Sequence, residues 1–189
     1  MRKTLQGVLW AGAAVAIPAA INAVIAMRAK SLGSSLPGDV AYYDWVHGRV
    51  AFYRMGQGDP LLLVHNPNAG GSSYEWRKVF PELANDYTVY AMDLLGFGLS
   101  EKPAIDYSGA LYAELIHDFL EDVVGVRAFA AGSGLSGSYL VNVAVRRPDG
   151  LQKLVLVNPT RVSLVMDPRT FERSLHVEVA AGRTDRKST

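Results

Sequence analysis

The sequence predicts an α/β protein with a mostly parallel sheet, helices on both faces of that sheet, and a membrane-spanning helix at the N-terminus. Short apolar runs such as Leu61–His65 (LLLVH) and Thr88–Met92 (TVYAM) are typical of strands buried on both faces. Segments with helical spacing of apolar residues separate these runs, and such alternation favours parallel strands. The third observation is the N-terminal run from Leu5 to Met27, which contains no charged residue.

The N-terminal run is long enough to cross a membrane. As a helix it would extend about 35 Å, against a hydrocarbon core of about 30 Å. It is longer than the apolar region of a cleaved signal peptide, about 7–15 residues, so an uncleaved single-pass anchor over residues 1–30 is favoured over a signal peptide. Positive residues flank both ends, so the sequence does not decide which side of the membrane the remainder occupies. Residues 31–39 (SLGSSLPGD) follow as a linker.

Composition excludes several classes of function. The chain has 189 residues, the length of a single domain, and a formal net charge of +1, which argues against a nucleic-acid partner. Cysteine is absent, so disulfides and thiolate metal ligands are ruled out. The four histidines are scattered without metal-ligand spacing, and no metal or other cofactor is expected.

Residues 40–159 predict a partial α/β core with six strands and three helices. The helix over 73–84 is expected to bend at Pro81, and that over 111–124 to end at Gly125. Residues 160–189 are expected to begin a helical cap or to form a disordered tail. The strands are expected at 40–47, 49–55, 61–65, 88–92, 127–131 and 153–158, and the third helix at 136–147.

The segments after the strands carry a family resemblance, because open α/β sheets bind ligands at the carboxyl ends of their strands. His65-Asn66-Pro67 follows one strand, D-L-L-G-F-G-L-S-E-K-P (93–103) follows the next, and G-S-G-L-S-G (132–137) follows a third. This order resembles the α/β-hydrolase superfamily, in particular the branch of haloalkane dehalogenases, epoxide hydrolases and small esterases. The resemblance covers about residues 42–159. It implies that an intact relative would attack an ester-like or carbon–heteroatom bond with a nucleophile.

The resemblance also implies where that nucleophile would stand. Its strand–turn–helix elbow places Gly134 at the nucleophile position and Leu135 at the residue whose amide stabilises the oxyanion. Glycine has no nucleophile. Ser136 and Ser133 are the neighbouring alternatives, and each is also explained as a small residue that allows close packing or caps a helix.

The oxyanion side of the resemblance is altered as well. His65 aligns with the histidine of the family's His-Gly pair, and Asn66 replaces the glycine. Pro67 has no amide hydrogen, so an oxyanion donor would have to come from another residue or from the Asn66 side chain. A packed, hydrogen-bonded role is expected for His65 rather than that of a base.

The family's acid and base histidine are not identifiable here. His176, Asp167 and Glu172 are poor candidates, so the chain is expected to be a C-terminally truncated relative whose last strands are missing. Two functions stay open: an inactive descendant of a membrane-anchored hydrolase, or a non-catalytic protein on the membrane that binds a small hydrophobic ligand or serves as a scaffold. A fragment without a stable product is the third alternative.

Overall fold

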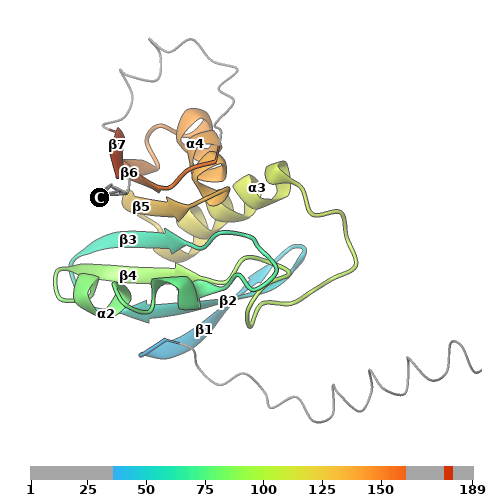
Figure 1. The fold of residues 1–189 in the computed structure, drawn as a ribbon, viewed down its shortest axis with the longest axis horizontal. Coiled ribbons are helices and arrows are strands. Elements are labelled where there is room, and N and C mark those ends of the chain that lie inside the picture. Colours follow the sequence, from blue (N-terminus) through green and yellow to red (C-terminus); the bar gives the residue numbers. More distant parts are fainter. Residues whose placement is uncertain (1–35, 161–176, 181–189) are drawn as a thin grey trace, which may run out of the picture. The chain divides into compact units, whose positions relative to one another are not determined.

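The computed structural model describes residues 36–160 and 177–180, which form a mixed sheet with helices on both faces (Figure 1). The strand order is β1-β2-β4-β3-β5-β6-β7. β1 pairs with β2, and β2 with β4, in antiparallel fashion, whereas the pairs from β4 onward are parallel. The strands are β1 (Asp39–Trp45), β2 (Gly48–Met55), β3 (Asp59–Val64), β4 (Tyr87–Met92), β5 (Ala128–Ser133), β6 (Leu151–Val157) and β7 (Val177–Ala180).

The predicted hairpin is present at the antiparallel end of the sheet. Trp45 of β1 pairs with Gly48 of β2, so Val46 and His47 form the turn and Gly48 opens the second strand. The Trp45 indole Nε1 donates to Asp118 Oδ2 at 2.8 Å, which ties the hairpin to the helix that covers this face.

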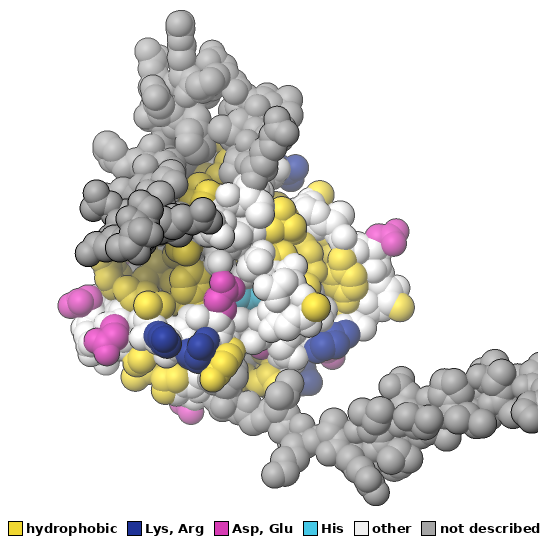
Figure 2. All heavy atoms as spheres, in the orientation of Figure 1, with side chains coloured by type: hydrophobic (Ala, Val, Ile, Leu, Met, Phe, Trp, Pro, Cys, Tyr) yellow, Lys and Arg dark blue, Asp and Glu magenta, His cyan; other side chains and the backbone are white. Residues whose placement is uncertain are grey.

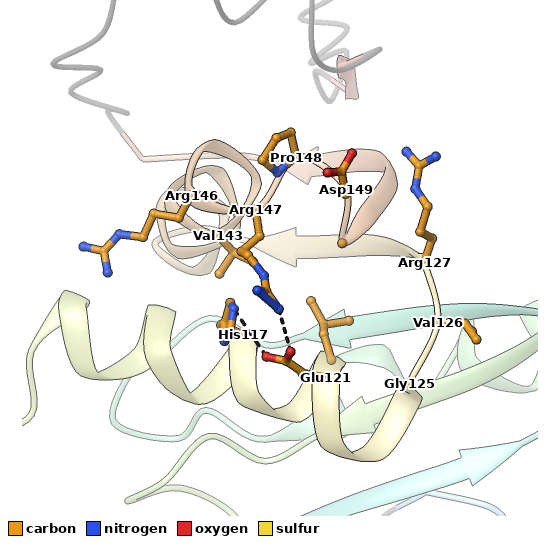
Figure 3. Close-up of a pocket in the computed structure, with 12 residues that line it drawn as sticks. His117, Glu121, Gly125, Val126, Arg127, Val143, Arg146, Arg147, Pro148 and Asp149 are labelled. Carbon is orange, nitrogen blue, oxygen red and sulfur yellow. Dashed lines mark hydrogen bonds and ion pairs between the residues drawn. The ribbon is translucent and has the colours of Figure 1, made fainter.

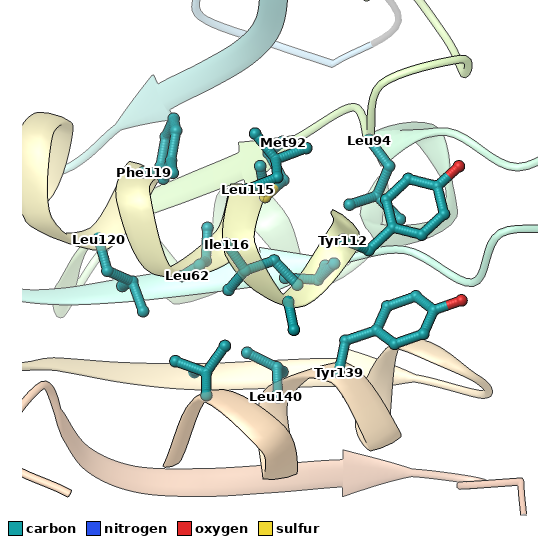
Figure 4. Packing of buried hydrophobic residues seen from close by; sticks show 14 of the residues in the cluster. Leu62, Met92, Leu94, Tyr112, Leu115, Ile116, Phe119, Leu120, Tyr139 and Leu140 are labelled. Carbon is teal, nitrogen blue, oxygen red and sulfur yellow. The ribbon is translucent and has the colours of Figure 1, made fainter. Parts of the chain in front are cut away.

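Two long helices cover one face of the sheet. They are α3 (Gly109–Phe119), extended by a π-helical turn η2 (Leu120–Val124), and α4 (Ser136–Arg146). The Ser108 side chain caps α3, and Gly125 ends the extension in a left-handed conformation. Figure 4 shows their apolar side chains meeting those of the central strands. The packed cluster includes Leu62, Met92, Leu94, Leu115, Ile116, Phe119 and Leu140, each fully buried.

The other face is covered by two short helices where the sequence predicted one bent helix over 73–84. The 3₁₀ turn η1 (Ser73–Trp76) and the single turn α2 (Phe80–Leu83) are separate elements. Pro81 explains the break, because its ring nitrogen cannot donate to the carbonyl one turn earlier and is tolerated only in the first turn of a helix. Trp76 and Phe80 still pack on Leu61 and Leu63 of β3, so this face is buried.

A seventh strand, β7, lies within residues 160–189, where the sequence predicts a cap or a tail. It pairs in parallel with β6, from Leu154 opposite Val177 to Val157 opposite Ala180. Within the described residues, β6 is therefore not the edge of the sheet. The predicted membrane span at 5–27 lies outside the described residues, and no helix among those described is long and apolar enough to cross a bilayer.

A buried carboxylate organises the loop after β4. The Asp93 side chain is fully buried and accepts the Ser73 amide at 2.6 Å and the Leu99 amide at 2.8 Å. Ser100 donates its hydroxyl to the Asp93 carbonyl at 2.5 Å and accepts the Ala51 amide at 2.8 Å. The loop is thereby joined to η1 on one side and to β2 on the other.

Gly98 makes this arrangement sterically possible, and Gly98→Ala should destabilise the fold by about 2 kcal/mol or more. Gly98 has φ +47°, and a Cβ atom there would overlap the Asp93 carboxylate. Gly70→Ala is the matched control, because no atom lies within 4 Å of its added Cβ. Urea unfolding followed by circular dichroism measures both variants. Equal midpoints for the two variants would contradict this role of Gly98.

Candidate active site

The candidate site lies where the carboxyl ends of β3, β5 and β6 meet. β5 ends at Ser133 and α4 begins at Ser136, so Ser133–Ser136 form the tight turn called here the elbow. Gly134 has φ +56°, in the left-handed region, and its amide donates to the Val157 carbonyl at the end of β6 at 3.0 Å. This strand–turn–helix geometry with a left-handed residue at its apex is the setting predicted for the nucleophile position.

The Asn66 side chain occupies the space in front of Gly134. A Cβ atom built on Gly134 would lie 2.5 Å from Asn66 Oδ1 and 2.6 Å from Asn66 Cγ. The Leu135 amide, the predicted oxyanion donor, donates to Asn66 Oδ1 at 3.1 Å. The Asn66 carboxamide therefore fills the space that a side chain at position 134 would occupy. It also accepts the hydrogen bond that the Leu135 amide donates.

Glu75 holds the two sides of this site together. Its Oε2 accepts the Asn66 amide at 2.7 Å, and its Oε1 accepts the Ser133 hydroxyl at 2.6 Å. Glu75 belongs to η1, so a single carboxylate joins the loop after β3 to the end of β5. Glu75 is not identifiable from the sequence, since a lone acidic residue in a short helix has no pattern that distinguishes it from a solvated one.

The two candidate serines are engaged in hydrogen bonds within the fold. Ser136 is fully buried and donates its hydroxyl to the His65 carbonyl at 2.6 Å. Ser133 is 8% exposed and donates to the Glu75 carboxylate. A serine nucleophile needs a base that accepts its proton, usually a histidine. Among the described residues, no histidine ring is hydrogen-bonded to either hydroxyl. The role of the two serines as nucleophiles stays a prediction.

His65 is a buried, neutral residue that positions the loop. Its Nδ1 donates to the Asn66 carbonyl at 3.0 Å, and its Nε2 accepts the Leu94 amide at 3.1 Å. Burial lowers the pKa of His65, against weaker upward effects of the hydrogen bond to Asn66 and of the charges on Asp93 and Glu75. Both ring nitrogens are satisfied in the neutral form, which fits the packed role that the sequence predicted.

A surface hollow of about 550 Å³ lies at the opposite end of the strands, beside the amino ends of β5 and β6 (Figure 3). It opens beside the residues that precede β5 and β6, whereas ligands of open α/β sheets bind at the carboxyl ends. Glu121 forms two ion pairs in its lining, with Arg147 Nη2 at 2.6 Å from its carboxylate and His117 Nε2 at 3.7 Å. The hollow is therefore separate from the elbow. Across residues 36–160 and 177–180, no cluster of three or more His, Asp or Glu side chains is placed to hold a metal ion.

The burial of His65 predicts a loss of stability in mild acid. The pKa of the folded state lies below the ordinary histidine value of about 6.5. The unfolded chain therefore binds the proton first, so this contribution is complete above about pH 6.5 and is lost as the pH falls below it. The free energy of unfolding, measured with urea at about pH 7.5 and about pH 5.5, should fall less in His65→Gln than in wild type. The exposed turn residue His47, changed to Gln, is the control and should keep the wild-type difference. Equal pH dependence in wild type and His65→Gln would contradict the prediction.

Comparison with known proteins agrees with this geometry. A family model described as the alpha/beta hydrolase family matches residues 45–187. The 2-hydroxy-6-oxo-6-(2'-aminophenyl)hexa-2,4-dienoic acid hydrolase of Metapseudomonas resinovorans is 34% identical over 108 residues, which cover 56% of this chain and 37% of that protein. Haloalkane dehalogenase 2 of Mycobacterium bovis is 32% identical over 124 residues, covering 65% and 42%.

A solved structure gives the same result for the fold. A serine hydrolase involved in carbazole degradation superposes with a TM-score of 0.63 at 29% identity, covering 68% of this chain and 51% of that one. The chain spans about two fifths of the length of the two curated relatives named above.

Proposed function

The chain belongs to the alpha/beta hydrolase family, and on that premise we propose that its core is a non-catalytic member that binds a small hydrophobic molecule at the elbow without hydrolysing it. The relatives named above are hydrolases and a dehalogenase, so the proposed ancestor cleaved an ester-like or carbon–heteroatom bond. The proposal concerns the elbow and the loop after β3.

The observation that carries the proposal is that Gly134 lacks a side chain and that the Asn66 carboxamide stands in its place. The position has the left-handed backbone of an elbow but no side chain, and the Asn66 carboxamide lies in the space that a side chain would use. A carboxamide nitrogen or oxygen is a poor nucleophile compared with an activated hydroxyl or a carboxylate. Covalent catalysis from this position is therefore not available to the chain.

The oxyanion side supports the same reading. Transition-state stabilisation needs donors that are free and aimed at the developing negative charge. The Leu135 amide already donates to Asn66 Oδ1, and Pro67 has no amide hydrogen to offer. The two backbone positions that the family resemblance assigns to the oxyanion are thus occupied, at Leu135, or without an amide hydrogen, at Pro67.

A serine-directed fluorophosphonate probe tests this function. We expect no covalent adduct on the folded wild-type chain, measured by peptide mass spectrometry, because position 134 has no hydroxyl and Ser133 and Ser136 lack a histidine partner among the described residues. Gly134→Ser is also expected to stay unlabelled, since a serine needs a base to activate it and the nearby His65 has both ring nitrogens engaged by the Asn66 carbonyl and the Leu94 amide.

An active serine hydrolase run in parallel shows that the probe is reactive. Ser136→Ala and Ser133→Ala are the control variants for the two candidate serines. An adduct on wild type that disappears in either variant would overturn the proposal and identify that serine as a nucleophile. The absence of any adduct on folded protein would support it.

A further inference from the structure

The Asn66 carboxamide lies at the elbow as a bound ligand would. It presents a neutral sp² oxygen to the Leu135 amide at 3.1 Å and fills the space left by the missing side chain of Gly134. We propose that Asn66 is a displaceable internal occupant of the elbow, and that a small neutral molecule with a carbonyl or carboxamide group binds by taking its place. This inference rests on the proposed non-catalytic binding function and adds the ligand class and the residue that controls access.

The Asn66 backbone is held much more firmly than its side chain. The backbone amide donates to Glu75, and the backbone carbonyl accepts from His65 Nδ1 and from the Asn68 amide at 2.9 Å. The side chain has a single hydrogen bond from a described residue, that of Leu135, and its Nδ2 atom donates to none of them. Rotation about the side-chain bonds therefore frees the Leu135 amide without moving the loop.

Glu75 is an exposed carboxylate beside the elbow, and its negative charge opposes the attraction of an anion to the N-terminus of α4. Glu75 lies in contact with both Asn66 and Ser133, and it forms no ion pair with a Lys, Arg or His in the described part of the chain. A carboxylate brought to the Leu135 amide would meet this like charge, which disfavours it. A neutral carbonyl oxygen, like that of Asn66 itself, carries no such cost.

The hydrophobic part of the ligand has a surface to rest on. Leu135 follows Gly134 directly, and 41% of its area is exposed although it is a large apolar residue. A small aromatic or aliphatic group attached to the carbonyl would cover it while the oxygen meets the Leu135 amide. Benzamide combines these two features and serves as the probe.

Binding of benzamide to the full chain, followed by NMR of the backbone amides, tests the displacement. Asn66→Ala removes the internal competitor and should bind benzamide about tenfold more tightly than wild type, the factor expected when a hydrogen-bonded closed state no longer competes. Asn68→Ala is the matched control, since Asn68 lies in the same loop and its side chain accepts only the Gly70 amide among the described groups. It should bind as wild type does. Benzoate should gain less than benzamide from Asn66→Ala.

A second variant tests whether benzamide uses the space in front of Gly134. Asn66→Ala/Gly134→Ala refills the space at the elbow with a methyl group and should lose the gain. Equal affinity of wild type and Asn66→Ala, an equal gain in Asn68→Ala, or no binding by any variant would overturn the inference. These outcomes are distinct from failure of the proposed function, which would show as a phosphonate adduct and not as a change in benzamide affinity.

Discussion

The hydrogen bond from the Leu135 amide to Asn66 Oδ1 is the contact on which the interpretation of this site depends. It joins the loop after β3 to the turn after β5, two segments that meet because their strands are neighbours in the sheet. The contact is possible only because Gly134 has no side chain, since a Cβ atom there would lie 2.5 Å from the same oxygen. Glycine at the apex and asparagine in the loop therefore form a complementary pair.

The surroundings of this pair show how the fold holds the elbow geometry with a glycine at its apex. Glu75 joins the loop to the end of β5, while His65 joins it to the loop after β4 through the Leu94 amide. Ser136 donates to the His65 carbonyl and so ties α4 to β3. The contacts of His65, Ser133 and Ser136 satisfy polar groups that the packing withdraws from water, and they stabilise the turn.

The strands and their alternation with helices could be predicted from the sequence, because continuous apolar runs such as 61–65 and 88–92 are typical of buried strands. The elbow position followed from the family resemblance, which aligns G-S-G-L-S-G (132–137) with the turn between a strand and a helix. The break in the helix over 73–84 was only partly foreseen at Pro81. The four-residue β7 has too short a pattern to be recognised. The positions of Asn66 and Glu75 depend on contacts between segments far apart in the sequence, and local pattern contains no information on them.

Nuclear Overhauser effects between the Asn66 side-chain amide protons and the Gly134 α protons test the central claim most directly. Asn66 Nδ2 lies 3.0 Å from the point where a Gly134 Cβ would stand, so these protons are close in space. We expect a clear cross-peak in the folded chain and its loss in Asn66→Ala. A folded wild-type chain that lacks this cross-peak, with the Leu135 amide exposed to solvent exchange, would contradict it.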